Sequence, residues 1–463
     1  MNPVEMYNEI VNRVPAYQKF LQEQTGGIPK VQTMEDLADI PLMDKASYIL
    51  KHPIEDLCLD GNVNCAHLWL RSSGTSRKPF FWPRRYEDEK NFPQGMRKLF
   101  HDYTASQKQP TLIIVGLALG PWGTGMQSSY AFRVLARETP GLALCSPGLN
   151  NDNILEVLER LSPNYSQTLL LSYPPFAKNV LEQAEAQGMD LPGRNIHVMV
   201  GGEGITEKYR EHMWKLLGHT EKDLNTVWCL YGSTDFANVG FENPLTIAIR
   251  RILTRHGLCR EILGEPAIPM FFQRAPLNSY FEEVNGELVV SRIQGIPLMR
   301  YRSGDHVRFM PRSEMLDRLR DHGHDAEQVV RDAGLPVPQW NTPFVALYGR
   351  IDQTLFFYGA NITLDQIKSA LESEQFEPYF NGRYLVRMTE DEHSNPQIEI
   401  SLPQSQALET ASLEHLADIY ADEFAKVQSE FRQVREQTPG LRHVRIVGAP
   451  DSSFELGWKT RHM

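Results

Sequence analysis

Residues 70–79 have the composition of a loop that wraps an anion. The run reads Leu-Arg-Ser-Ser-Gly-Thr-Ser-Arg-Lys-Pro, with hydroxyl side chains around one glycine and two cations after them. Glycine lets backbone N–H groups turn inward, hydroxyls add donors and the cations add charge, so a phosphate chain is the natural guest. The run lacks the spaced glycine and the Gly-Lys-Ser/Thr ending of a Walker A loop. A solvated turn is the alternative, because these residue types also favour turns.

Further polar landmarks follow along the chain. They are Tyr231-Gly232-Ser233-Thr234-Asp235, Tyr301-Arg302-Ser303-Gly304-Asp305, Gly349-Arg350-Ile351-Asp352 and Gly457-Trp458-Lys459-Thr460-Arg461. A site for a nucleoside triphosphate and its Mg²⁺ needs carboxylates, hydrogen-bonding groups and cations, and these stretches supply all three. A carboxylate such as Asp235 suits Mg²⁺. A second carboxylate such as Asp305 can accept from ribose hydroxyls, and a guanidinium such as Arg350 can pair with ribose or phosphate oxygens.

Short apolar runs alternate with amphipathic stretches between residues 110 and 235. We expect strands over 112–115, 168–173, 196–200 and 226–231, and helices over 153–161, 176–186 and 206–217. This alternation is typical of βαβ units with a largely parallel sheet. Ligands of such sheets gather at the carboxyl ends of the strands. The run Gly201-Gly202-Glu203-Gly204 and the landmark that begins at Tyr231 both fall at strand ends.

The remaining segments predict an N-terminal helical region, a β-rich subdomain and a small C-terminal domain. Residues 5–24 predict a helix broken or bent at Pro15, and Thr33 opens another short helix. A helix over 244–258 precedes strands over 286–291 and 297–302, a tight turn at Ser303-Gly304-Asp305 and the run 306–309, and residues 311–338 are partly helical. Past residue 350 we expect strands over 354–358, 384–389, 397–402 and 443–447, a turn at 359–361, a helix capped by Thr363 and Gln366, and a long helix over 412–436.

The predicted fold class is therefore α/β. It comprises a large N-terminal α/β body with mostly parallel sheets and a β-rich subdomain, plus a small mobile C-terminal α+β domain. The predicted domains are 1–349 and 350–463.

Composition narrows the class of protein. The chain has 463 residues, 41% of them hydrophobic, and a formal net charge of −11. That charge argues against a nucleic acid or an anionic membrane as partner. No apolar run approaches the ~18 residues of a membrane-spanning helix, and the first residues lack the features of a secretory signal. Five scattered cysteines suit reduced thiols, so we expect a cytoplasmic protein.

In this order and at these separations, the landmarks resemble the acyl-adenylate-forming superfamily, and within it phenylacetate–CoA ligase and its relatives. The resemblance runs over most of the chain. It also includes Val14-Pro15-Ala16-Tyr17, Pro174-Pro175-Phe176-Ala177, Gly201-Gly202-Glu203 and Gly359-Ala360-Asn361-Ile362. One such motif alone is weak, whereas several in the right order, with a domain break near Arg350, are specific.

The resemblance implies an ATP-dependent, AMP-forming acid–thiol ligase that uses ATP, Mg²⁺ and coenzyme A. A small-molecule carboxylic acid, aryl or arylacetic, attacks the α-phosphate of ATP, and a thiol then displaces AMP from the acyl-adenylate. One alternative keeps adenylation but passes the acyl group to a carrier-protein thiol, an amine or a hydroxyl. Another is a nucleotide-binding protein without turnover. A homodimer is a further expectation from the resemblance.

The resemblance also implies roles for individual residues. Lys459 and Thr75 are the catalytic candidates, Asp235 is the metal ligand, and Asp352 is the hinge about which the small domain turns between half-reactions. Tyr231 would stack on adenine, Asp305 and Arg350 would take the ribose, and Glu203 would line the nucleotide and acyl pocket. The full set of candidate nucleotide-binding residues is Ser72, Ser73, Gly74, Thr75, Ser76, Lys78, Gly202, Glu203, Tyr231, Gly232, Ser233, Thr234, Asp305 and Arg350.

The sequence departs from the family pattern at three places. Arg77 stands where the phosphate loop usually has a second glycine, Asp235 stands where the family usually has glutamate, and Trp458 separates the usual Gly-Lys pair of the tail. The shorter Asp235 side chain favours a water bridge to the metal. Core packing is the alternative role for Tyr231. It is also the alternative for three residues that suggest an aromatic acyl pocket, Trp122, Phe132 and Tyr173.

Overall fold

The structure is a computed structural model of the chain. It describes residues 2–72, 80–90, 93, 96–97, 109–265, 267–275, 278–351, 355–357, 360–391, 395–437, 440–454 and 461–462. Several predicted site residues lie outside these ranges, namely Ser73, Gly74, Thr75, Ser76, Arg77, Lys78, Asp352 and Lys459.

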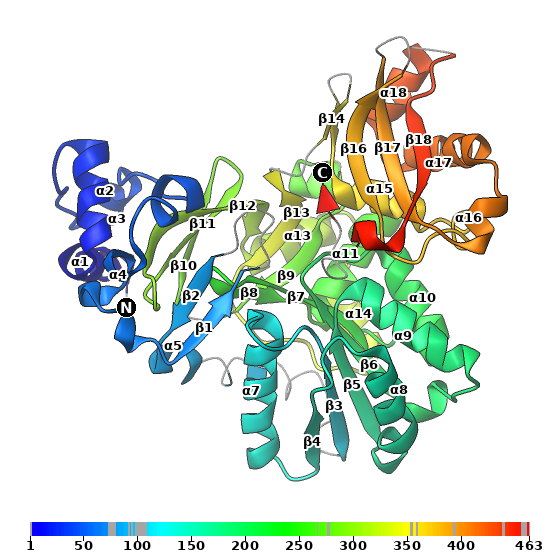
Figure 1. Ribbon diagram of the computed structural model, residues 1–463, viewed down its shortest axis with the longest axis horizontal. Coiled ribbons are helices and arrows are strands. Elements are labelled where there is room, and N and C mark those ends of the chain that lie inside the picture. Colours follow the sequence, from blue (N-terminus) through cyan, green and yellow to red (C-terminus); the bar gives the residue numbers. More distant parts are fainter. Residues whose placement is uncertain are drawn as a thin grey trace.

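One large sheet forms the body of the protein (Figure 1). Within the described residues it has eleven strands in the order β10-β11-β12-β13-β9-β8-β7-β6-β5-β3-β4. The parallel strands are β3 (Thr111–Gly116), β4 (Leu142–Cys145), β5 (Gln167–Ser172), β6 (Ile196–Gly201) and β7 (Val227–Ser233). The intervening helices are α7 (Gly123–Glu138), α8 (Asn151–Arg160), α9 (Pro174–Ala186) and α10 (Glu207–Leu217). The predicted parallel βαβ region is confirmed.

The predicted β-rich subdomain continues the same sheet with antiparallel strands. These are β8 (Ala237–Phe241), β9 (Met270–Arg274), β10 (Tyr280–Val284), β11 (Glu287–Arg292), β12 (Leu298–Met310) and β13 (Phe344–Arg350). Helices α11 (Pro244–His256) and α12 (Cys259–Leu263) precede β9, and α13 (Arg312–Asp321) and α14 (Ala326–Asp332) lie between β12 and β13.

The predicted tight turn at Ser303-Gly304-Asp305 is wrong, because β12 runs through these residues. Glu287 on β11 pairs with His306, whereas Val289 pairs with Arg302, so the register shifts between these pairs. Such a bulge accommodates extra residues in one strand without ending it. Gly304 has φ +79°, in the left-handed region that glycine adopts at low cost.

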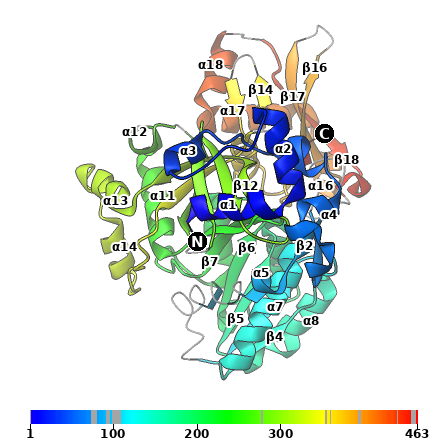
Figure 2. The same cartoon turned by 90° about the vertical axis from the view of Figure 1, so that its left-hand side faces the viewer.

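The N-terminal segment folds as helices beside the antiparallel part of the sheet. Helix α1 (Pro3–Arg13) contacts β11 and β12, and α2 (Pro15–Thr25) begins at Pro15, where a proline suits the first helical position (Figure 2). Thr33 caps α3 (Met34–Ala38), as predicted. A short π-helix, η1 (Lys45–Ile49), and α4 (Ile54–Leu57) lead to the hairpin of β1 (Leu68–Arg71) and β2 (Phe81–Arg84), which α5 (Tyr86–Lys90) follows.

The C-terminal segment has its own small sheet, with strand order β18-β17-β16-β19 among the described residues. Its elements are β14 (Leu355–Phe357), β15 (Ala360–Ile362), α15 (Leu364–Leu371), β16 (Leu385–Glu390), β17 (Pro396–Pro403), α16 (Gln406–Thr410), α17 (Leu413–Val427), α18 (Ser429–Gln437), β18 (Val444–Ala449) and β19 (Arg461–His462). Thr363 and Gln366 form the predicted capping box of α15.

Two predictions for this segment are wrong. Residues 360–361, expected in a turn, belong to β15. The expected helix over 412–436 is two helices, because Gln428 has extended backbone with φ −123°. The Gln428 Oε1 atom accepts from the Phe431 N–H at 3.0 Å, so this side chain caps the new helix instead of continuing the old one.

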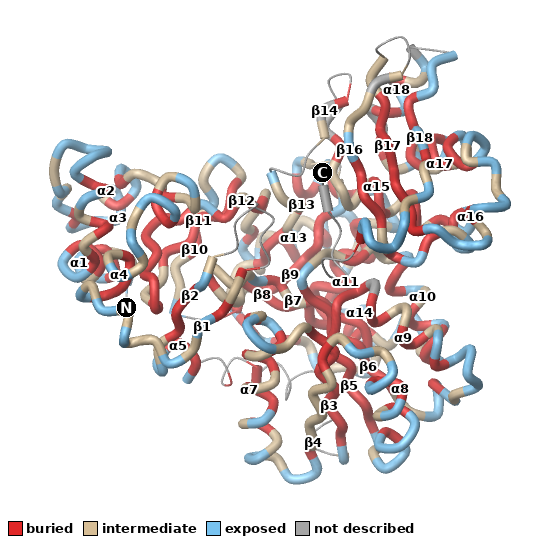
Figure 3. Tube along the Cα trace, in the orientation of Figure 1, coloured by how far each residue is buried: buried red, intermediate tan, exposed pale blue. Residues whose placement is uncertain are grey.

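Two hydrophobic cores occupy different parts of the chain. One draws on residues from Tyr7 to Tyr348, and the other on residues from Phe357 to Ile446. Figure 3 shows buried residues concentrated along the central strands, with exposed residues on the outer helices and turns. The predicted domain boundary at 349/350 falls between the two cores. No helix in the part of the chain that the structure describes is long and apolar enough to cross a membrane.

His197 on β6 predicts a pH-dependent stability. Its side chain is buried against Gln167, and its Nδ1 atom lies 3.2 Å from the Asn225 carbonyl oxygen. Burial, helped by the nearby His219, lowers the pKa of His197 from 6.5 to about 4. The unfolded chain therefore takes up this proton first as the pH falls. We expect the free energy of unfolding to be fully retained above pH 6.5 and to fall by about 3 kcal/mol on approach to pH 4.

Urea denaturation at a series of pH values between 7.5 and 4 measures this effect. The matched variant is His197→Gln, which keeps a polar side chain but cannot titrate in this range. An equal loss of stability in the variant and the natural protein would assign the pH dependence to other groups.

Candidate functional site

The two ends of the predicted phosphate loop are held together. Ser72 at the end of β1 donates its N–H to the Phe80 carbonyl oxygen at 3.0 Å, and the Phe80 N–H donates to Ser72 Oγ at 3.2 Å. Lys45 Nζ, from η1, donates to the same Ser72 Oγ at 3.3 Å. The loop thus starts and ends at one place, and a lysine from a distant part of the chain lies beside it.

Three predicted site residues, one each from β7, β12 and β13, meet in the structure. Tyr231 donates its hydroxyl to Asp305 Oδ2 at 2.7 Å, and Arg350 Nη1 lies 3.7 Å from Asp305 Oδ1. Burial and the Asp305 carboxylate raise the pKa of Tyr231 well above its usual value, so the hydroxyl remains a donor. The Tyr231 ring stacks on Phe272, with ring centroids 5.4 Å apart. One ring face therefore packs in the core, while the hydroxyl orients Asp305.

The bulge in β12 makes this meeting possible. Arg350 Nη1 also donates to the Ser303 carbonyl oxygen at 3.3 Å. A Cβ atom on Gly304 would lie 2.8 Å from Arg350 Nη2, so glycine leaves room for the guanidinium. The Asp305 N–H donates to Ser303 Oγ at 3.0 Å. The residues predicted to form a turn thus position the carboxylate and the cation.

The turn after β7 is packed from several sides. A Cβ atom on Gly232 would lie 2.6 Å from the Ala237 carbonyl oxygen, so only glycine fits there. Arg84 of β2 donates to the Thr234 carbonyl oxygen, and Gln294 Nε2 donates to the Asp235 carbonyl oxygen at 2.6 Å. The Arg84 contact ties the hairpin that flanks the predicted phosphate loop to the turn that bears Asp235.

The Asp235 carboxylate is the candidate metal ligand. Its Oδ2 atom accepts from the Tyr301 hydroxyl at 3.0 Å, and Ser233 Oγ accepts from the Asp235 N–H at 3.1 Å. Burial raises the pKa of Asp235, and the positive charge of Lys45 opposes that rise. No group of three or more metal-ligating side chains occurs among the described residues. One carboxylate fits Mg²⁺, because this ion commonly takes one or two protein carboxylates and completes its shell with water and phosphate oxygens.

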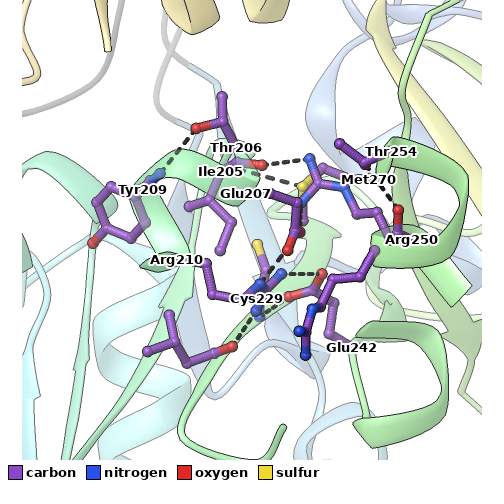
Figure 4. Close-up of polar contacts among 12 residues, drawn as sticks. Ile205, Thr206, Glu207, Tyr209, Arg210, Cys229, Glu242, Arg250, Thr254 and Met270 are labelled. Carbon is purple, nitrogen blue, oxygen red and sulfur yellow. Dashed lines mark hydrogen bonds and ion pairs between the residues drawn. The ribbon is translucent and has the colours of Figure 1, made fainter. Parts of the chain in front are cut away.

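The turn of residues 201–206 after β6 carries Gly202 and Glu203. Gly202 has φ +92°, a conformation that other residues rarely adopt. Below the turn lies the buried network drawn in Figure 4. Arg250 donates to the Ile205 carbonyl oxygen at 2.6 Å and to Glu207 Oε1 at 2.9 Å. The turn is therefore anchored to the body at its C-terminal end.

The same network reaches β7. Arg210 donates to Glu242 Oε1 at 2.7 Å and also contacts Glu207 and the Val227 carbonyl oxygen. Glu242 Oε2 accepts from the Cys229 N–H at 2.8 Å. Charged side chains thus link the turn after β6 to strand β7.

The three residues that suggested an aromatic acyl pocket have different surroundings in the structure. Phe132 is fully buried in the core, and Tyr173 is also buried there. Trp122 precedes α7, and the Arg71 guanidinium lies 5.2 Å from its ring centroid. Phe132 and Tyr173 therefore pack in the core, which was the alternative role named for these residues.

Sequence reasoning missed two cations of this site, Lys45 and Arg84. Lys45 is the first residue of the short π-helix η1 and belongs to no recognisable motif. Arg84 is 1% exposed, and burial lowers its pKa to about 10, so it remains charged at neutral pH. The available signal was an arginine that directly follows the apolar run Phe-Trp-Pro, since an arginine in a buried strand needs a partner.

Comparison with known proteins gives a structural match only. Neither a family model nor a curated protein sequence matches the chain. A crystal structure of 2-hydroxyisobutyryl-CoA ligase in the postadenylation state, bound to R3-HIB-AMP, aligns with 99% of this chain and 87% of its own, at 12% identity and a TM-score of 0.62. The same ligase bound to 2-HIB-AMP aligns with 97% and 85%, at 14% identity and a TM-score of 0.57.

An open conformation of that ligase, bound to 2-HIB-AMP and CoA, aligns with 96% of this chain and 86% of its own, at 13% identity and a TM-score of 0.51. The chain has the fold of the acyl-adenylate-forming enzymes. In this fold, the turns after β6 and β7 lie at carboxyl ends of parallel strands, where open α/β sheets bind ligands. The predicted site residues on these turns therefore occupy a suitable position for a ligand.

Proposed function

We propose that this protein is an ATP-dependent, AMP-forming ligase that activates an aryl or arylacetic acid and transfers it to coenzyme A. The observation that carries the proposal is the convergence of Tyr231, Asp305 and Arg350 within a fold of this kind. The proposed family is that of the phenylacetate–CoA ligases. The proposed domains are an adenylation domain, 1–349, and a C-terminal lid domain, 350–463.

The proposed reaction has two steps. A carboxylate oxygen of the acid attacks the α-phosphorus of ATP, the bond to the bridging oxygen breaks, and pyrophosphate leaves. The thiolate of coenzyme A then attacks the acyl carbon, and AMP leaves with the former carboxylate oxygen. Negative charge accumulates around the phosphates in the first step, so catalysis consists largely of positioning and charge stabilisation.

The residues of the site suit these tasks. Asp305 would accept from ribose hydroxyls, with its orientation set by Tyr231 and Arg350. Lys45, beside Ser72, would supply positive charge to the phosphates. Asp235 would hold Mg²⁺, which neutralises phosphate charge when bound. We also propose Thr75 and Lys459 as catalytic residues and Asp352 as the hinge.

Two other functions remain as candidates from the sequence. In one, the acyl group passes to a carrier-protein thiol, an amine or a hydroxyl. In the other, the protein binds a nucleotide without turnover, which the departures at Arg77, Asp235 and Trp458 suggest.

A panel of carboxylic acids tests the proposal. Aryl, arylacetic and aliphatic acids are each offered with ATP and Mg²⁺, and pyrophosphate release is measured with and without coenzyme A. Sustained release that needs both an aryl or arylacetic acid and coenzyme A is the expected result. Release that needs hydroxylamine instead of coenzyme A, without thioester, would favour another acceptor. Absence of release with every acid would contradict the enzymatic proposal.

Lys45→Met is expected to lower kcat/KM for ATP about 10-fold, because a cation beside the phosphate loop is lost at nearly constant side-chain volume. Steady-state kinetics with ATP varied at saturating acid measure this change. Lys51→Met is the matched control, since Lys51 is an exposed lysine of the same segment. Equal kinetics in the two variants would exclude Lys45 from nucleotide binding.

A further inference from the structure

The C-terminal domain contacts the body at the segment that carries Glu203. Lys368 Nζ, from α15, donates to the Gly204 carbonyl oxygen at 3.2 Å and lies 3.9 Å from Glu203 Oε1. Glu372, at the end of the same helix, accepts from the Thr206 hydroxyl. These contacts join α15 to the turn of residues 201–206, which lies beside the predicted nucleotide and acyl pocket.

Lys368 is almost completely buried by this docking. Its exposed fraction is 3%, although lysine is almost never buried unless it is paired. Burial alone would lower the pKa of Lys368, but the carboxylates of Glu203, Glu372 and Asp365 outweigh burial and raise it. The side chain is therefore a charged donor held among carboxylates from both domains.

The two ends of the turn are held differently. Its C-terminal end belongs to the body, because Arg250 donates to the Ile205 carbonyl oxygen and Thr206 caps α10 through the Tyr209 N–H (Figure 4). At its other end, Cys229 Sγ lies 3.6 Å from the Glu203 carbonyl oxygen, and a thiol is a weak donor. Lys368 adds a charge-assisted hydrogen bond at Gly204, next to the φ +92° conformation of Gly202.

We propose that Lys368 is a positioning residue that orders the Gly202-Glu203-Gly204 part of the turn when the C-terminal domain is docked. The consequence for catalysis rests on the proposed function. The acid and ATP must be placed as separate molecules before the first bond forms, so the first half-reaction needs an ordered pocket. Rotation of the small domain about the proposed hinge would carry Lys368 away from the turn before the second half-reaction. Lys368 thereby couples docking of the domain to adenylation.

The first test needs no substrate. Hydrogen–deuterium exchange of peptides that cover residues 201–206 is compared in the natural protein, Lys368→Met and Lys426→Met. Lys426 is the matched control, because it is an exposed lysine of the same domain that pairs with Glu423. We expect faster exchange of these peptides in Lys368→Met alone. Unchanged exchange in Lys368→Met would overturn the positioning role.

The second test separates the half-reactions. Phenylacetate-dependent exchange of pyrophosphate into ATP reports the first, and single-turnover thioester formation from preformed phenylacetyl-adenylate and coenzyme A reports the second. Lys368→Met is expected to slow the first on the order of 10- to 100-fold and to leave the second unchanged. Equal loss in both half-reactions would contradict the coupling of docking to adenylation.

The two tests fail independently. If the natural protein exchanges no pyrophosphate with phenylacetate or any other acid, the proposed function fails, while hydrogen–deuterium exchange still decides whether Lys368 orders the turn. Glu372→Gln provides a second variant if Lys368→Met does not fold, because it weakens the Thr206 contact and keeps the lysine. Faster exchange over residues 201–206 is again expected, and unchanged exchange would count against the proposal.

Discussion

Arg210→Met is expected to lower the free energy of unfolding by about 3–5 kcal/mol at neutral pH, the range found when one partner of a buried ion pair is removed. The Arg210 side chain is completely buried, and so is that of Glu242, 2.7 Å away. Methionine fills much of the volume but leaves the Glu242 charge without its nearest cation. Urea or thermal denaturation measures the loss.

The loss should depend on pH in a predictable direction. Burial raises the pKa of Glu242, and Arg210 opposes that rise, so the pKa should climb further in the variant. A carboxyl group with a raised native-state pKa contributes stability at low pH that disappears as the pH rises through that pKa. We therefore expect Arg210→Met to be less destabilised at pH 5 than at pH 8.

Two further variants check the cause. Arg210→Met combined with Glu242→Leu removes both charges and should recover part of the lost stability. Arg255→Met is the control on the surface, where Arg255 and Glu221 are both largely exposed, and it should change stability by less than about 1 kcal/mol. A double variant that is less stable than Arg210→Met would contradict the electrostatic explanation.

Asp305→Ala is expected to lower kcat/KM for ATP about 100-fold, if the proposed function holds. The substitution removes the acceptor proposed for the ribose and also the partner of Tyr231 and Arg350. Hydrogen bonds to a charged group contribute about 1.5–3 kcal/mol, which corresponds to factors of roughly 10 to 100 in rate. Steady-state kinetics with ATP varied, and direct titration of ATP by calorimetry, measure the effect.

Tyr231→Phe is the matched control for this prediction. It keeps the ring stacked on Phe272 and removes only the hydroxyl that orients Asp305. A loss of less than about 10-fold is expected, because the carboxylate remains. An ATP affinity in Asp305→Ala equal to that of the natural protein would exclude Asp305 from the nucleotide site.

The local pattern of the sequence was enough to predict most elements. The alternation of apolar runs and amphipathic stretches from residue 110 onward correctly predicted β3, β5, β6 and β7 and the helices α8, α9 and α10, whereas it did not predict α7 and β4, which lie between β3 and β5. The period of hydrophobic residues reports which face of an element is buried, and this is a local property. Caps at Thr33 and Thr363 were readable for the same reason, since a capping hydrogen bond spans only a few residues.

Errors arose where local signals supported two structures. The residues Ser303-Gly304-Asp305 favour a turn, yet the pairing of β12 with both β11 and β13 keeps them in one strand with a bulge. The apolar pattern over 412–436 continues through Gln428, but the helix ends there and a second helix begins. The Phe431 ring of the second helix packs against Phe424 of the first. In both cases the deciding partners come from other elements.

The sequence by itself determined the class of fold, the order of the polar landmarks and the residue types available for chemistry, because these depend on local patterns and on chain order. The tertiary structure alone decided which residues meet. It brought Lys45 to Ser72, Arg84 to Thr234, Asp305 to Tyr231 and Lys368 to Gly204. Each of these pairs is distant in sequence, and such contacts are set by how the elements pack in three dimensions, which leaves no spacing pattern in the chain.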